Sequence, residues 1–195
     1  MRIEDCGGTP VISRPVPRPA HRGPQPVPLA EIPAGPAPDL PLELVRRDIA
    51  GDRPGVPLML RIRVLHAASH LPVTAAVVDL RHPAPAAPAA ELRGAQVTDV
   101  DGYAEFRTVH PGRIPGEPVR IDASVHVGGI LAGGRAVTYA GPLFVPEQIA
   151  GQITPGPAGD PDPHPIAGGP LTVVPRDRFD LAAGLLATIT VTVGN

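Results

Sequence analysis

Residues 92–112 read Leu92-Arg93-Gly94-Ala95-Gln96-Val97-Thr98-Asp99-Val100-Asp101-Gly102-Tyr103-Ala104-Glu105-Phe106-Arg107-Thr108-Val109-His110-Pro111-Gly112. The centre of this stretch, residues 98–102, favours a turn, because Asp and Thr side chains bond nearby backbone groups and Gly accepts left-handed backbone angles. Residues 103–109 predict the strand that leaves the turn. The stretch is therefore typical of a β-rich fold.

Alternating apolar and polar residues recur on both sides of this stretch. They occupy residues 57–65, 119–127 and 185–193, and each run predicts a strand with one buried and one polar face. Two further apolar runs, residues 73–80 and 136–145, predict strands as well. Several short strands at this spacing favour an all-β fold, an antiparallel β-sandwich.

The segments between the expected strands are rich in Gly and Pro, of which the chain holds 22 and 29. We expect a turn at residues 66–72, a loop at residues 83–90 and a long loop at residues 151–170. A short helical turn is expected around residues 40–48. No long amphipathic helix is evident.

Eleven prolines fall within residues 10–41. Each lacks an N–H donor, so the segment should be extended or coiled and should not form a helix or a central strand. We expect residues 1–54 to form a long Pro-rich N-terminal arm and residues 55–195 to form the sandwich domain. An arm of this kind is ordered only when something holds it, either its own domain or a neighbouring subunit.

Composition excludes some classes of function. The net charge is −2 and only 3% of residues are aromatic, so neither charge nor base stacking favours a nucleic-acid partner. All 17 basic residues are Arg, which is typical of a GC-rich bacterial genome. No transmembrane run or signal peptide is evident, so we expect a cytoplasmic protein by default, with extracellular assembly left open. The single Cys6 is an incidental thiol or an intermolecular attachment point.

The segments Arg93-Gly94, Thr98-Asp99-Val100-Asp101-Gly102 and Pro111-Gly112 stand in a specific order and spacing. In this pattern the chain resembles the intradiol ring-cleavage dioxygenases, iron(III) enzymes that open catechol rings. Less specific likenesses lie at residues 71–80, where Ala75 stands at a position that is commonly Gly in the family, and at Pro146-Glu147. The resemblance covers roughly residues 55–193 and implies an antiparallel sandwich of the immunoglobulin-like or prealbumin-like kind.

The resemblance also implies where the iron ligands, two Tyr and two His, would lie. By this alignment Ile114 replaces one tyrosine, while Arg120 and Asp122 replace the two histidines. Glu117 replaces a nearby Arg, and residues 81–90 contain no counterpart of the other tyrosine. Ferric iron needs anionic oxygen or imidazole donors, so we expect no cofactor and no catalytic residue here. A salt bridge between Arg120 and Asp122 should fill the vacated site.

A weaker alternative polar site consists of His82, Asp122 and His126, which would hold a divalent metal if the fold brought them together. The competing interpretation is that these histidines are scattered over the surface. Asp99 and Asp101 are interpreted as turn residues, because their spacing does not match an EF-hand loop.

Three functions compete at this point. The first is a non-catalytic structural or assembly subunit that self-associates, or scaffolds a companion protein, through its N-terminal arm and strand edges. The second is an enzyme that acts on an aromatic or polyketide-like molecule in the vestigial cleft. The third is a small-ligand or carbohydrate-binding module, against which the absence of Trp counts.

Overall fold

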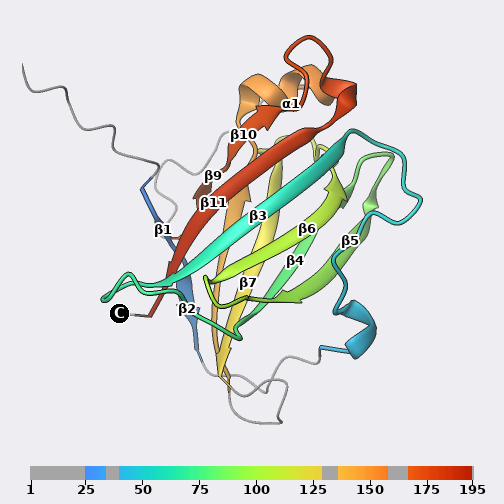
Figure 1. Ribbon diagram of the computed structural model, residues 1–195. Helices are drawn as coiled ribbons and strands as arrows, with labels where there is room; N and C mark the ends of the chain where they lie inside the picture. The colour runs from blue at the N-terminus through green and yellow to red at the C-terminus, as the bar shows by residue number, and fades with distance from the viewer. Residues whose placement is uncertain (1–24, 34–39, 129–135, 158–166, 195) are drawn as a thin grey trace, which may run out of the picture.

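The computed structural model describes residues 25–33, 40–128, 136–157 and 167–194, and two β-sheets packed face to face make up most of it (Figure 1). The elements in chain order are β1 (Val27–Pro28), β2 (Ala30–Ile32), η1 (Leu42–Leu44), β3 (Pro57–His66), β4 (Val77–Ala84), β5 (Ala87–Val97), β6 (Tyr103–Val109), β7 (Arg120–Gly128), β8 (Ala136–Phe144), α1 (Glu147–Ile153), β9 (Gly169–Pro170), β10 (Thr172–Pro175), η3 (Leu181–Ala183) and β11 (Leu185–Val193). The expected all-β sandwich is confirmed. No helix among these residues is long and apolar enough to cross a membrane.

The first sheet has the order β1-β11-β3-β6, with β10 also paired to β11, and the second has the order β2-β8-β7-β4-β5, with β9 also paired to β8. Most pairs are antiparallel, as expected. The long pair between β3 and β11 is parallel, from Leu58 opposite Leu185 to His66 opposite Val193. Alternation along a strand shows which face is buried but says nothing about the direction of its partner.

The core lies between the two sheets and is almost wholly aliphatic. Every second residue of β3, from Leu58 to Val64, is buried. Alternate residues of β11, beside β3 in the same sheet, and of β7, in the facing sheet, are buried in the same core. Phe106 is the largest side chain that is fully buried. Each fully buried Val, Leu or Ile side chain of this core stabilises the fold by about 1.5–3 kcal/mol relative to the same side chain left exposed.

Three local expectations differ from the structure. Residues 83–90 are not a loop, because β4 continues to Ala84 and β5 begins at Ala87, which together form a hairpin with a register shift after Pro83. β5 is an edge strand, where proline is tolerated. The segment from 151 begins inside the short helix α1, whose Ala150 is buried against the core. The strand expected at residues 73–80 starts only at Val77, because Ala75 takes a left-handed φ of 55°.

The turn at residues 98–102 has the expected chemistry. The Asp99 carboxylate accepts hydrogen bonds from the backbone N–H groups of Asp101 and Tyr103. The Thr98 hydroxyl donates to the carbonyl of Val73, and Gly102 has a φ of 79°. The interpretation of the two aspartates as turn residues is therefore supported by their contacts.

Residues 45–49 close one side of the sandwich. Val45 bridges to Ala95 on β5, and Asp48 bridges to Arg107 on β6, so this segment crosses from the edge of one sheet to the edge of the other. Ile49 is buried at the end of the crossing. A Cβ on Gly94 would lie 2.1 Å from Ile49 Cγ2, which explains why glycine follows Arg93 here.

Two segments close the opposite side in the same manner. β1 pairs with β11 and β2 with β8, so residues 27–32 cross from the edge of the first sheet to the edge of the second. Leu29 is buried at this crossing. Leu171 is buried between β9 and β10 in an equivalent crossing. Part of the Pro-rich arm therefore lies on its own domain as short edge strands. Residues 1–24 lie outside the described residues, and the boundary expected at residue 54 stays a prediction.

Candidate functional site

A cleft of about 360 Å³ lies at the end of the sandwich where β7 begins and β4 ends. The four positions that the sequence singled out all line it, namely Ile114, Glu117, Arg120 and Asp122. Glu91 and His82 line it as well. We call this the acidic cleft, because three carboxylates surround a single arginine.

Arg120 is clamped between two carboxylates. Its Nη1 lies 3.0 Å from an oxygen of Glu117, and its Nε lies 3.2 Å from an oxygen of Asp122. The expected salt bridge is therefore present and has a second partner. All three side chains are 38–47% exposed, so each pair contributes at most about 1 kcal/mol to stability.

Arg113 holds the loop that carries Ile114 and Glu117. Its side chain is only 7% exposed, its Nε donates to the carbonyl of Thr154 at 2.8 Å, and its Nη2 meets a Glu147 carboxylate oxygen at 2.6 Å. A buried guanidinium with these partners anchors the loop to α1. The wall of the acidic cleft is thus fixed from behind.

The residues at this site do not fit ferric iron. Ile114 has no donor atom, and the guanidinium of Arg120 stays charged and cannot coordinate a metal. Asp122 is the one oxygen donor among the positions that the resemblance assigns to ligands, and it already pairs with Arg120. The described residues also contain no cluster of three or more His, Cys, Asp and Glu arranged to hold a metal ion.

His82 belongs to a buried polar pair behind the cleft. Its Nδ1 donates to the carbonyl of Pro83 at 3.0 Å, which leaves Nε2 as an acceptor for the Thr108 hydroxyl at 2.7 Å. Burial lowers the pKa of His82, so the ring is neutral in the folded protein. The hydrogen bonds from the Thr108 hydroxyl to His82, and from His82 to the carbonyl of Pro83, fix the orientation of both side chains between the sheets.

His110 follows Thr108 on the same inward-facing side and is only 1% exposed. Neither of its ring nitrogens has a hydrogen-bond partner. Burial is the main cause that lowers its pKa to about 4; the backbone of Pro111 opposes this shift, and the neighbouring His82 and Arg113 contribute to it. His110 is therefore a neutral side chain at pH 7, held in the interior.

Of the three residues of the alternative polar site, His82 and Asp122 both line the acidic cleft, and His126 does not. His126 is four residues beyond Asp122 on β7, about 13 Å along the strand, and its Nδ1 shares a hydrogen bond with the Thr138 hydroxyl. His82 lies behind the cleft and bonds Thr108. Burial lowers the pKa of His126, whose ionic neighbours are the paired Asp79 and Arg93. The side chains of His82, Asp122 and His126 do not form a metal-binding cluster in the part of the chain that the structure describes.

Sequence reasoning located the acidic cleft through the resemblance but missed the buried groups behind it. Thr108 lies near the end of β6 and His110 directly follows the strand, and in extended chain a spacing of two places both side chains on one face. Alternation predicted the buried face of this strand, but no local pattern indicated that His82 would meet it from the other sheet.

No protein-family model matches the sequence, and no curated protein sequence matches it. Solved structures do match. An intradiol ring-cleavage dioxygenase from Tetranychus urticae shares 18% identity over 85% of this chain and 94% of that one, with a TM-score of 0.61. The dioxygenase domain of a dioxygenase carbohydrate-binding fusion from Streptomyces sp. SirexAA-E shares 22% identity over 87% of this chain and 98% of that one, with a TM-score of 0.57.

A 3-chlorocatechol 1,2-dioxygenase from Rhodococcus opacus 1CP also matches, at 16% identity over 85% of this chain and 72% of that one, with a TM-score of 0.53. These similarities show that the chain has an intradiol dioxygenase-like fold, which confirms the fold that the sequence resemblance implied. At such identities they carry the fold alone, because one fold hosts many functions.

Proposed function

We propose that this protein is a non-catalytic subunit that uses an intradiol dioxygenase-like sandwich as a scaffold and assembles with copies of itself or with a companion protein. The observation that carries the proposal is the clamp on Arg120. Glu117 and Asp122 hold this guanidinium at the position where the resemblance places metal-binding imidazoles. A neutralised cation there replaces the centre on which ring cleavage depends.

Exposed apolar side chains supply a surface for assembly. Val174 and Leu186 are opposite each other in the β10–β11 pair and are 55% and 41% exposed. Phe179, in the connection that follows β10, is 83% exposed. Large apolar side chains that gather on one surface are typical of protein–protein contact sites.

The strand edges support the assembly role less than the sequence suggested. Residues 27–32 and 169–175 of the chain itself pair with β11 and β8, whereas residues 45–49 meet β5 and β6 only at the isolated bridges of Val45 and Asp48. A covered edge cannot accept a strand from a partner, so the edges left for assembly are those of β5 and β6. The role therefore falls to these two edges, to the apolar surface and to residues 1–24 of the arm.

Light scattering after size-exclusion chromatography tests the assembly role. We expect a mass well above that of the 20.1-kDa chain, and a lower mass for Leu186→Asp. Thr188→Asp is the matched control, because Thr188 is exposed two positions along the same strand face. Removal of residues 1–24 leaves every described strand intact and isolates the contribution of the arm. A monomer at all concentrations contradicts self-association and leaves only the version of the proposal with a companion protein.

Metal content and colour test the non-catalytic half of the proposal. Protein purified after growth with iron should be colourless and should remain so when catechol is added. Stoichiometric iron with a tyrosinate-type absorption band would mean that the alignment of the ligand positions is wrong and that the chain is a dioxygenase.

The acidic cleft itself favours one alternative, an enzyme or ligand-binding protein for an aromatic small molecule. Its volume of about 360 Å³ is within the range of small-molecule pockets, and Ile114 and Pro118 give it an apolar wall. Turnover of catechols or related aromatics that is lost in Asp122→Asn would favour this alternative over a scaffold.

A further inference from the structure

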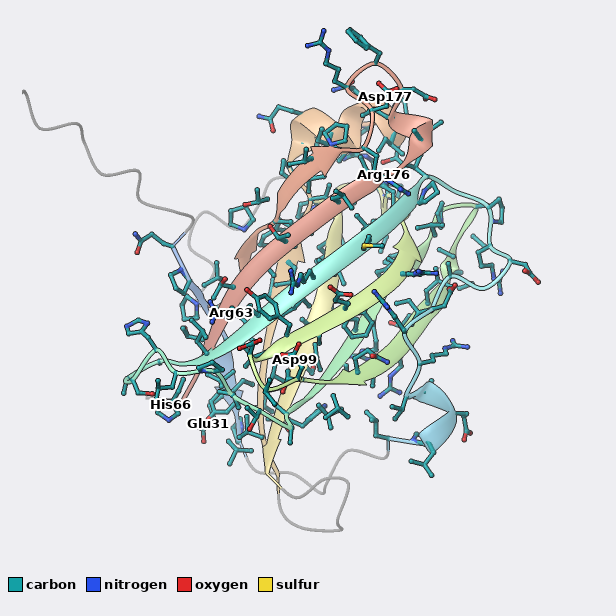
Figure 2. All side chains as sticks on the ribbon, in the orientation of Figure 1. Glu31, Arg63, His66, Asp99, Arg176 and Asp177 are labelled. Carbon is teal, nitrogen blue, oxygen red and sulfur yellow. The ribbon has the colours of Figure 1, made fainter. Side chains whose placement is uncertain are left out.

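A second pocket, of about 510 Å³, opens at the same end of the sandwich on the side of the other sheet. It lies where β3 and β11 begin and β6 ends, and its lining includes Asp48, Arg53 and Gly55 from the segment before β3. Three arginines from separate parts of the chain line it, namely Arg53, Arg107 and Arg176. We call it the arginine pocket; Figure 2 shows Arg176 beside the start of β3 and β11.

These arginines lack the partners that most other arginines have. Arg61 contacts Glu105 and the Tyr103 ring, and Arg113 and Arg120 are ion-paired. Within the described part of the chain, the arginine side chains without a hydrogen bond, ion pair or ring contact are four: Arg53, Arg81, Arg107 and Arg176. Three of those four line one pocket, although the protein as a whole has a net charge of −2.

The single acidic residue of the pocket does not neutralise it. The Asp48 carboxylate accepts hydrogen bonds from the backbone N–H groups of Ala50 and Gly51, and it forms no ion pair with an arginine of the pocket. Three guanidinium groups and one carboxylate leave a net charge of about +2. A concave wall of one sign concentrates counter-ions of the other sign.

The remaining lining is apolar. Leu58, Val109 and Leu185 are nearly fully buried and contribute to the floor, and Met59 adds a half-buried side chain. Arginine recognises carboxylate and phosphate groups in a bidentate manner. A pocket with cations at its rim and an aliphatic floor suits a molecule with a compact body and several oxyanion groups.

We propose that the arginine pocket binds a small multivalent oxyanion, carrying phosphoryl or carboxylate groups, through Arg53, Arg107 and Arg176. This site lies on the other side of the sandwich from the acidic cleft and does not depend on the assembly role. It would give the molecule an anionic ligand even though the one cation of the acidic cleft is already paired.

Isothermal titration calorimetry of the full chain tests the proposal, with pyrophosphate and citrate as probes at constant ionic strength set with NaCl. We expect submillimolar binding of at least one probe. Arg107→Gln and Arg176→Gln should each weaken that binding at least tenfold. Arg81→Gln is the matched control, because it removes an equally exposed and unpartnered arginine from outside the pocket, and it should change the affinity less than twofold.

The two probes separate the sources of the oxyanion. Tighter binding of pyrophosphate assigns the pocket to phosphoryl ligands, and tighter binding of citrate assigns it to polycarboxylates. Equal weakening in all three variants would overturn the site, because the effect would then follow overall charge. Heats that track ionic strength alone, or no binding of either probe, would overturn it as well.

Discussion

The acidic cleft and the arginine pocket lie at one end of the same sandwich and handle charge in opposite ways. In the acidic cleft the one cation, Arg120, is held by two carboxylates. In the arginine pocket three cations share one carboxylate that is engaged by backbone N–H groups. The difference teaches that a cavity can be present without a free cation to bind an anion. An anionic ligand is therefore expected in the arginine pocket, where the positive charge is uncompensated.

His82 lines the acidic cleft and Thr108 lines the arginine pocket, so these two hydrogen-bonded residues, with the nearby His110, form a partition between the pockets. The partition is the first place to test this comparison, and acid pH should have the largest effect. His110 is neutral and buried, with a pKa lowered to about 4 against 6.5 for an unperturbed histidine. A lowered pKa means that the unfolded chain takes up the proton first as pH falls. The stability that this group confers is complete above pH 6.5 and is lost progressively down to about pH 4.

We expect the free energy of unfolding to fall by about 3 kcal/mol between pH 7 and pH 4 on account of His110 alone. His110→Leu should flatten this dependence in urea unfolding curves. The stability of His110→Leu at pH 7.5 measures the packing cost of the substitution separately. An unchanged pH dependence in the variant would show that other groups control acid unfolding.

Thr108→Val should have the next largest effect, because it leaves Nε2 of the buried His82 without its donor. We expect a loss of about 1–3 kcal/mol in the free energy of unfolding at neutral pH. Thr108→Ser retains the hydroxyl and should recover most of that loss. If valine and serine behave alike, the hydrogen bond contributes nothing and the partition is held by packing.

Arg120→Met would break the comparison from the side of the acidic cleft. The ion pairs are partly exposed, so we expect a stability change of at most about 1 kcal/mol. Glu91, Glu117 and Asp122 would then line the cleft without a cation, and added salt screens the repulsion between their carboxylates. Added NaCl should therefore raise the melting temperature of Arg120→Met more than that of Arg81→Met, which loses the same charge elsewhere.

The smallest effect should come from the arginine pocket in the absence of ligand. Arg107→Gln and Arg176→Gln remove no hydrogen bond or ion pair, so we expect stability changes below about 0.5 kcal/mol at low salt. Differential scanning calorimetry can compare them with Arg113→Gln, which removes a buried anchor. A loss above 1 kcal/mol in either variant would mean that these arginines have structural partners.

Sequence patterns predicted the strands in which one face is buried and the other faces water. Residues 119–127 alternate strictly, and β7 lies there with its odd-numbered residues inward. The turn at residues 98–102 was predicted because its chemistry is local. The hairpin at residues 83–90 was missed, because its composition of Pro and Ala is that of a loop and only the pairing with β4 makes it a strand.

Of the two sites, one could be predicted from the sequence and the other could not. The acidic cleft was located because Ile114, Glu117, Arg120 and Asp122 lie within nine consecutive residues that resemble a known motif. The arginine pocket had no such signal, because Arg53, Arg107 and Arg176 come from segments more than fifty residues apart. Only the fold brings them together, and only the positions of the neighbouring side chains show that they have no hydrogen-bond or ion-pair partner.

The parallel pairing of β3 with β11 also determines when the sandwich can form. Leu58 and Leu185 are partners across more than a hundred residues of intervening chain, and the segment at residues 27–28 pairs with β11 as well. Contacts of such separation close slowly, because the entropy of a long loop is lost before the contacts form. During synthesis β3 keeps an open edge until residues 185–193 emerge from the ribosome, and in that interval the chain is most prone to aggregate.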